Sequence, residues 1–133
     1  MPKISANPQG VSRPDPGATY AQVTRVGNLI FTSGQTARDA SGTVIGKGDI
    51  HAQARQVFEN IKTVLASQGA SMDDVVKRNL YLKQIQHLPE VYKVMAQYFP
   101  NASAYPACAC IQAAELADPD YLLEIEVVAT VKE

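Results

Sequence analysis

Two stretches of the chain repeat apolar residues with the period of a helix. Residues 49–68 and residues 88–98 place their apolar side chains at steps of three and four, which gathers them on one face of an amphipathic helix. These apolar positions are Ala54, Val57, Phe58, Ile61, Val64 and Leu65 in the first stretch, and Leu88, Val91, Val94, Met95 and Tyr98 in the second. Gly69 is placed to end the first helix, and Pro89 falls in the first turn of the second, where its missing N–H is not needed.

Five further segments have the apolar content typical of β-strands. They span residues 20–26, 29–33, 75–82, 107–113 and 121–131. Gly27 and Asn28 separate the first two segments by a tight turn, which predicts a hairpin. Residues 5–19 are rich in Pro, Gly and Ser and are predicted to form an extended arm or loop. The element order ββαβαββ predicts an α+β fold, in which one sheet carries both helices on the same face.

The face of the sheet away from the helices is predicted to be too apolar for full exposure to water. Leu122 and Val128 are expected there, together with the strand face that carries Cys108 and Cys110. We therefore expect further copies of the chain to cover this face in a homo-oligomer.

Length and charge narrow the classes of function. The chain has 133 residues, which suits one domain, residues 1–133, with a single core. Its formal net charge is −1 and it has no basic run, which counts against nucleic acid as a partner. No segment approaches the ~18 apolar residues of a membrane span. The N-terminal sequence MPKISANPQG lacks the apolar centre of a secretion signal, so we expect a cytoplasmic protein with reduced cysteines.

Cys108 and Cys110 are the only two cysteines, and they stand one residue apart in an apolar strand. Alternate residues of a strand point the same way, so both side chains share a face with Gln112. A disulfide at this spacing has unfavourable geometry, a zinc site needs about four ligands, and a catalytic thiol needs a nearby base. The two histidines, His51 and His87, lie far along the chain. Two main alternatives stay open, which are the filling of sheet surface and the lining of a pocket without covalent chemistry.

Two carboxylates, Glu124 and Glu126, share one face of the last predicted strand. One interpretation is an exposed face or an ion pair with Arg78 or Lys77 on another strand. The alternative is a buried carboxylate whose raised pKa lets it hold a water molecule or move a proton.

Four stretches of the chain resemble the Rid family, also called the YjgF or L-PSP family, of enamine/imine deaminases. They are TYAQVTRVGNLIFTSGQ at 19–35, HAQARQVFENIKTVLASQGASMDDVVKRNLYLK at 51–83, YPACACI at 105–111 and LEIEVVAT at 123–130. The resemblance covers roughly residues 18–131. It implies a chorismate-mutase-like fold that assembles as a homotrimer, with three active sites in clefts between subunits. The implied activity is hydrolysis of a reactive enamine or imine, such as 2-aminoacrylate, to a 2-oxo acid and ammonia, with no metal and no organic cofactor.

The resemblance also assigns roles to single residues. Tyr20 matches the tyrosine of the family's cleft, and Ser33, with the Gly34 backbone, matches the serine of the SGQ motif. Cys110 matches the cysteine whose backbone amide faces the ligand. Glu124 matches the glutamate that positions the hydrolytic water. By residue type alone, Tyr20 and Ser33 indicate only packing and a backbone hydrogen bond at the ends of strands.

The cysteine strand departs from the family pattern at one position. Family deaminases usually read P-A-R-x-C there, whereas residues 106–110 read PACAC, so Cys108 replaces the arginine that would clamp a substrate carboxylate. A neutral thiol cannot make the paired hydrogen bonds of a guanidinium. Tyr92, in place of a smaller polar residue, is expected to narrow the cleft. We therefore expect weak binding of α-imino acids unless Arg78 supplies another cation. A substrate other than a simple 2-imino acid is compatible with this expectation.

Three other functions compete with deamination. The trimer cleft would hold a small metabolite without turning it over if the missing arginine has removed catalysis. Some relatives carry the label of endoribonuclease, against which the near-neutral charge counts. A redox or holdase function would use the thiols of Cys108 and Cys110.

Overall fold

The structure is a computed structural model that describes residues 1–132 as one mixed sheet with two α-helices. The strands are β1 (Lys3–Ala6), β2 (Val23–Val26), β3 (Leu29–Thr32), β4 (Val75–Leu82), β5 (Ala107–Gln112) and β6 (Leu123–Thr130), and the helices are α1 (Ile50–Ser67) and α2 (Leu88–Tyr98). Their order across the sheet is β1-β2-β3-β6-β4-β5. β4 and β5 run parallel, and the other neighbours run antiparallel. No helix in residues 1–132 is long and apolar enough to cross a membrane.

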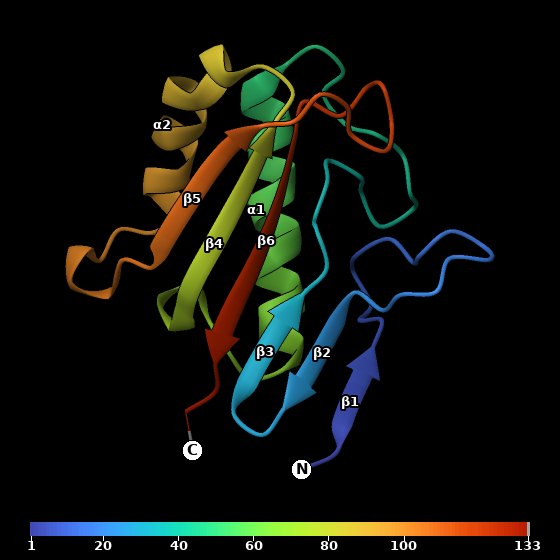
Figure 1. Cartoon of the computed structure of the whole chain (residues 1–133), viewed down its shortest axis with the longest axis vertical. Helices are drawn as coiled ribbons and strands as arrows, with labels where there is room; N and C mark the ends of the chain where they lie inside the picture. Colours follow the sequence, from blue (N-terminus) through green and yellow to red (C-terminus); the bar gives the residue numbers. More distant parts are fainter. Residues whose placement is uncertain (133) are drawn as a thin grey trace.

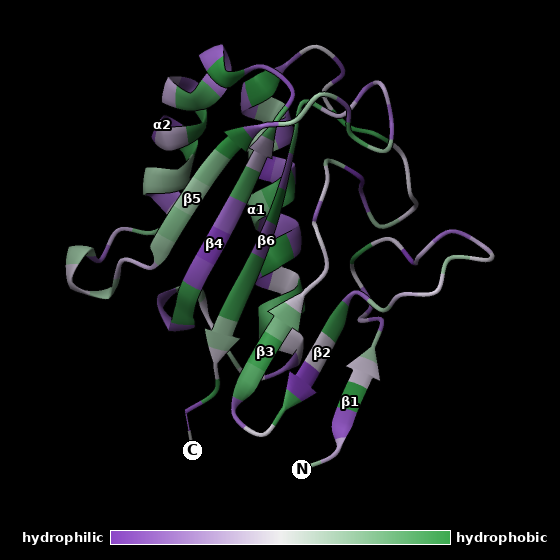
Figure 2. Ribbon diagram, viewed as in Figure 1, coloured by the Kyte–Doolittle hydropathy of each residue, from purple (hydrophilic) through white to green (hydrophobic). Residues whose placement is uncertain are grey.

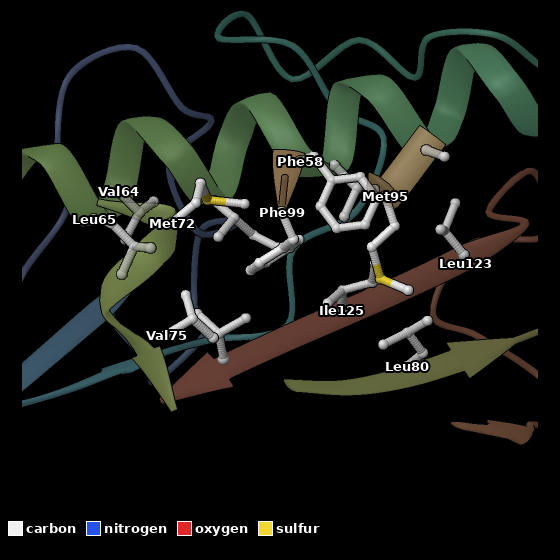
Figure 3. Close-up of a cluster of buried hydrophobic side chains, with 14 of the residues drawn as sticks. Phe58, Val64, Leu65, Met72, Val75, Leu80, Met95, Phe99, Leu123 and Ile125 are labelled. Atoms are coloured by element: carbon white, nitrogen blue, oxygen red, sulfur yellow. The ribbon is translucent and has the colours of Figure 1, made fainter. Parts of the chain in front are cut away.

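Both helices lie behind the sheet in Figure 1, so one face of the sheet is covered and the other is open. The core fills the space between α1 and the sheet, where Phe58 of α1 packs above Leu80 and Ile125 (Figure 3). All three side chains are fully buried. The ring of Phe58 also stacks on Tyr98 with the ring centres 5.2 Å apart, which ties α1 to α2. Burial of this apolar stripe is what the helical period of the sequence predicted.

The predicted α+β fold is confirmed, and both helices end within one residue of the predicted limits. The side chain of Asp49 caps α1 by accepting a hydrogen bond of 3.1 Å from the backbone N–H of Ala52. Gly69 follows the last turn with a φ of +79°, a conformation that favours glycine over residues with a β-carbon. The helix therefore begins and ends where local chemistry dictates.

The N-terminal strand β1 is an element that the sequence analysis did not predict. β1 pairs antiparallel with β2, so that Ile4 lies opposite Arg25. The element order is therefore βββαβαββ rather than ββαβαββ. The strand has only four residues at the edge of the sheet, and their side chains are mostly exposed. The four residues KISA do alternate polar and apolar, but so short a run at an exposed edge gives too weak a pattern to distinguish a strand from an extended arm.

The cysteine face of β5 lies on the helix side of the sheet, which corrects the expectation that it faces away from the helices. β5 pairs with β4 so that Cys108 lies opposite Arg78 and Cys110 opposite Leu80. Leu80 is buried beneath the helices, and Cys110 packs against the same core. The open face of β5 instead carries Ile111, which is 53% exposed. Both cysteines are free thiols.

Strand β4 contains an irregularity that sets the direction of its side chains. Its pairing with β6 shifts between Val75 and Lys77, which leaves Val76 exposed as a bulge. Beyond this point Arg78 lies on the helix face, and its guanidinium carbon stands 4.6 Å from the centre of the Phe99 ring. From Lys77 onward the pairing is regular, so Arg78 shares the helix face with Leu80 and Leu82.

The open face of the sheet carries exposed apolar side chains. Leu29 and Phe31 of β3 are 42% and 41% exposed, and Val128 of β6 lies directly opposite Phe31. Strands β3, β5 and β6 are coloured mainly as hydrophobic in Figure 2. Leu122 does not contribute to this face, since it packs against the core.

Candidate functional site

A cavity of about 380 Å³ opens beside the segment that follows β3, next to the first residues of β6. Four of the predicted site residues line it, namely Tyr20, Ser33, Gly34 and Glu124. Their positions in the sequence are up to 104 residues apart, from 20 to 124, so the sheet brings them together. The strand pattern alone made Glu124 a candidate, whereas Tyr20, Ser33 and Gly34 were indicated only by the family resemblance.

The carboxylate of Glu124 lies directly against the backbone of Gly34. A β-carbon at position 34 would stand 2.6 Å from Cδ of Glu124 and would overlap its Oε2 atom. Any side chain at position 34 would therefore displace the carboxylate. The glycine is needed here for space, and this reason was not visible in the sequence.

The SGQ segment is fixed at both ends by hydrogen bonds. The backbone N–H of Ser33 donates to the carbonyl of Gln22 (2.9 Å), and its hydroxyl donates to the carbonyl of Ala21 (2.6 Å). Two residues on, Gln35 exchanges backbone hydrogen bonds of 2.8 and 3.0 Å with Ile125 of β6. The intervening glycine is thereby held beside β6. Because the hydroxyl proton of Ser33 is already used, its oxygen is left to accept a hydrogen bond from a ligand.

Burial raises the pKa of Glu124 above its ordinary value of 4.5, and the nearby charge of Glu126 raises it further. Glu126 accepts a hydrogen bond from the hydroxyl of Tyr81, which lies opposite Glu124 on β4. Within residues 1–132, neither carboxylate forms an ion pair with Arg78 or Lys77. Of the two interpretations of this pair, the partly buried carboxylate describes Glu124.

Arg38 is a cation of the same cavity that sequence reasoning missed. Its Nε donates to the hydroxyl of Tyr121, its Nη1 donates to the carbonyl of Gly42 (2.6 Å), and its Nη2 lies 3.5 Å from Oδ2 of Asp118. Tyr121 is 83 residues away along the chain, so no local motif indicates the pair. All three nitrogens of this guanidinium are engaged with the protein, and Arg38 builds the wall of the cavity.

Two buried glutamines form a second feature that the sequence did not reveal. The amide nitrogen of Gln35 donates to the side-chain oxygen of Gln22 (2.8 Å), and the amide nitrogen of Gln22 donates to the carbonyl of Ser12 (2.8 Å). This chain of hydrogen bonds ties the N-terminal loop to the SGQ segment. The only available signal was the glutamine of the SGQ motif itself.

Tyr20 stands at the rim of the cavity, where its side chain is 53% exposed. Partial burial and the negative charge of Asp15 raise its pKa above 10.0. The phenol therefore stays protonated at neutral pH and can donate a hydrogen bond to a ligand.

Tyr92 and Cys108 line a different cavity of about 300 Å³, which lies on the helix face of the sheet beside β5. Arg78, Met95, Phe99 and Tyr105 also line it. None of the residues that line this cavity also lines the cavity of Glu124. Within a single chain, Tyr92 and Cys108 therefore lie in a different cavity from Tyr20, Ser33, Gly34 and Glu124.

Cys110 lines neither cavity with its side chain, but its backbone lies at a free edge. Burial raises the pKa of the Cys110 thiol, which packs against the core. The backbone N–H of Ala113 donates to the carbonyl of Leu82 on β4 (2.8 Å). Because N–H groups alternate along a strand, the N–H groups of Cys108 and Cys110 point away from β4 and toward the edge of the sheet.

No cluster suited to hold a metal ion occurs among residues 1–132, taking groups of three or more His, Cys, Asp and Glu side chains. Nε2 of His51 lies 2.6 Å from Oε2 of Glu90, so this histidine links α1 to α2. The chemistry that these residues support is acid–base and hydrogen-bonding chemistry around Glu124.

Comparison with known proteins gives one consistent family. The model of the family described as "Endoribonuclease L-PSP" matches residues 10–131. A RutC family protein of Pyrococcus abyssi is 39% identical over 116 residues, which are 87% of this chain and 89% of that protein. The 3-aminoacrylate deaminase RutC of Acinetobacter baylyi is 37% identical over 131 residues, which are 98% of this chain and 100% of that protein.

Solved structures agree with the sequence comparison. Yeast Mmf1 superposes with a TM-score of 0.90 at 29% identity, covering 98% of this chain and all of that one. Escherichia coli TdcF with bound serine gives a TM-score of 0.87 at 28% identity, covering 97% of this chain and 99% of that one. With the family model spanning nearly the whole chain, this protein belongs to the Rid (YjgF/L-PSP) family.

Proposed function

We propose that the protein hydrolyses a reactive enamine or imine to a carbonyl compound and ammonia. The observation that carries this proposal is the position of Glu124, a half-buried carboxylate with a raised pKa that lies against Gly34 in a cavity of about 380 Å³. A relative that is 37% identical over almost the entire chain is named a 3-aminoacrylate deaminase, which supports the same class of reaction.

The reaction asks little of the protein beyond positioning and proton transfer. A protonated C=N carbon is already electrophilic, so water adds to it once a base accepts a proton from the water. Glu124 is the base, and the glutamic acid that results returns the proton to nitrogen as ammonia leaves. A raised pKa suits both steps, since it strengthens the base and keeps its acid form present at higher pH. The balance is one imine and one water converted to one carbonyl compound and one ammonia.

The substrate is held by groups that stay neutral. The oxygen of Ser33 accepts a hydrogen bond, and the phenol of Tyr20 donates one from the rim. The outward-facing backbone amides at Cys108 and Cys110 supply further donors at the edge of β5. Tyr92 narrows the approach along α2.

We infer that the complete site forms between subunits of a homotrimer. In one chain the Glu124 cavity and the Cys108 cavity share no lining residue, so a neighbouring copy is required to join them. The open face of the sheet has the exposed apolar residues that such an assembly would cover, among them Phe31 and Ile111.

The test is the release of ammonia from 2-aminoacrylate and 3-aminoacrylate generated in the assay, compared with the uncatalysed rate. Wild-type protein should accelerate release, and Glu124→Gln should lose the acceleration while the exposed-helix control Glu59→Gln keeps it. Equal rates for wild type and Glu124→Gln would remove Glu124 from the mechanism. No acceleration with any imine, alongside a metabolite bound in the cavity, would instead identify a binding protein.

RNA cleavage is the competing activity, since the family model is described as an endoribonuclease. The net charge of −1 offers little attraction to a phosphate backbone. Cleavage of RNA by purified wild-type protein that falls with added salt and is lost in Glu124→Gln would favour this activity over deamination.

A further inference from the structure

Arg78 carries a guanidinium that the fold buries without giving it an acceptor. Its Nε and Nη1 atoms are buried and have no hydrogen-bond partner among residues 1–132. Its guanidinium carbon stands over the Phe99 ring, 4.6 Å from the ring centre, which is within the range of a cation–π contact. Burying such donors without an acceptor costs stability, and an acceptor that arrives later recovers that cost.

The surroundings of Arg78 form a receptive cavity rather than a closed core. Arg78, Phe99 and Cys108 line the 300 Å³ cavity on the helix side of β5, together with two tyrosines, Tyr92 and Tyr105. No carboxylate lines this cavity, and no ion pair involves Arg78 within the described chain. The cavity thus combines one cation, free donors and space for a small molecule.

The other two arginines near the predicted site differ from Arg78. Arg38 is already engaged through all three guanidinium nitrogens, by Tyr121, by Gly42 and by Asp118. Arg13 lies at the exposed edge of the Glu124 cavity. Of these three arginines, Arg78 is the one with buried, unpaired donor atoms and a contact with an aromatic ring.

The register of the sheet links Arg78 to the position of the missing family arginine. Cys108 lies directly opposite Arg78 on the neighbouring strand, and both side chains project to the helix face. Adjacent strands are about 4.8 Å apart. This chain therefore has a cation one strand away from position 108, and the small thiol of Cys108 leaves space beside it.

We propose that Arg78 binds the carboxylate of a small ligand that enters this cavity beside Cys108. A guanidinium binds a carboxylate through paired, charge-assisted hydrogen bonds, and a turn of the Arg78 side chain toward the cavity would bring its unpaired donors to the ligand. If the proposed deaminase function holds, on which this part rests, the substrates are carboxylate-bearing enamines or imines after all. The loss of the arginine at 108 then does not by itself weaken α-imino acid binding.

The first experiment observes the wild-type side chain directly. Pyruvate is titrated into the full-length protein while the arginine Nε–H resonances are followed by NMR, with methyl pyruvate as the uncharged probe of equal shape. The Arg78 resonance should shift progressively with pyruvate and not with methyl pyruvate. A resonance that stays in place while pyruvate binds elsewhere, or an equal response to both compounds, would overturn the proposal.

The second experiment moves the charge back. Arg78→Gln should weaken pyruvate binding by about tenfold to a hundredfold, the range for a charge-assisted hydrogen bond, whereas Lys62→Gln, an equal charge change on the exposed side of α1, should not. The double variant Arg78→Gln/Cys108→Arg should recover most of the lost affinity. Loss of binding in Arg13→Gln instead, or an unchanged affinity in Arg78→Gln, would contradict the assignment.

These measurements separate the inference from the proposed function. Pyruvate binding involves no hydrolysis, so Glu124→Gln should bind pyruvate as wild type does while losing ammonia release. Binding through Arg78 without any deaminase activity would leave the carboxylate site standing and refute the function. Deaminase activity without an effect of Arg78→Gln on pyruvate binding would support the proposed function and refute the carboxylate site at Arg78. If Arg78→Gln does not fold, the wild-type titration decides.

Discussion

The backbone of Gly34 and the carboxylate of Glu124 occupy adjoining space, so that a β-carbon on residue 34 would lie 2.6 Å from Cδ of the glutamate. The two residues are 90 positions apart and meet because Gln35 pairs with Ile125 near the beginning of β6. The glycine of the SGQ motif is therefore part of the geometry that places the carboxylate proposed to be catalytic.

Gly34→Ala should displace the carboxylate of Glu124 and lower both stability and activity. Forcing an extra methyl into a packed core costs about 1–3 kcal/mol, but here the atoms that must move are the end of a flexible side chain, so the loss should lie near the lower end of that range. The free energy of unfolding in urea, measured at fixed protein concentration, should fall by that amount, and ammonia release should fall with it.

A double-mutant cycle tests whether Glu124 is the cause. In the background Glu124→Ala the carboxylate is absent, so Gly34→Ala should cost much less stability than in wild type. Neighbours in contact show coupling of about 0.5–3 kcal/mol. Equal costs in both backgrounds would mean that the methyl collides with something else.

The pH dependence of the reaction should report the interaction of Glu124 with Glu126. Burial and the charge of Glu126 both raise the pKa of Glu124, so the acidic limb of kcat/KM should lie above the ordinary value of 4.5. Glu126→Gln removes the neighbouring charge and should move this limb to lower pH, although burial keeps it above 4.5. The measurement is the pH profile of both proteins with one substrate. If the acidic limb does not move, the charge of Glu126 does not affect the pKa of Glu124.

Glu124→Gln should also make the protein more stable at neutral pH while it abolishes activity. The folded pKa of Glu124 is raised, so the folded state keeps a proton that the unfolded chain has already released. The free energy of unfolding of wild type therefore decreases as pH rises from 4.5 through the raised pKa. Glutamine has no such dependence, and the gain should be present at pH 8 and small at pH 4. Urea unfolding at both values, with Glu59→Gln as control, would contradict this if the Glu124 variant were less stable at pH 8.

The sequence predicted both helices and strand β4 well because their patterns are local. The stripe around Phe58 repeats with the helical period, and capping residues mark its ends. The surroundings of Arg78 were not predictable, because its unpaired donors and its contact with Phe99 depend on packing between distant segments. The Arg38–Tyr121 pair was equally hidden, since it joins segments 83 residues apart.

Tyr121→Phe should lower stability by removing the acceptor of the Arg38 Nε–H. An unmade hydrogen bond to a charged, partly buried donor costs about 1–3 kcal/mol. Thermal or urea unfolding should record this loss, while Tyr92→Phe, at a side chain that is 47% exposed, should change little. An unaltered unfolding midpoint for Tyr121→Phe would mean that Gly42 and Asp118 suffice to hold Arg38.

Phe31→Lys should dissociate the proposed trimer. Phe31 lies on the open face of the sheet, is 41% exposed in the single chain and stands opposite Val128. Full burial of such a side chain contributes about 1.5–3 kcal/mol, and each subunit of a trimer would contribute one. Sedimentation velocity at several concentrations should find a trimer for wild type and smaller species for the variant. Ile85→Lys, at an apolar residue that is 38% exposed in a turn outside the sheet, is the matched control and should stay trimeric.

Because the Glu124 and Cys108 cavities share no residue within one chain, dissociation should also abolish ammonia release. A wild-type monomer, or a monomeric variant that keeps full activity, would contradict a site formed between subunits.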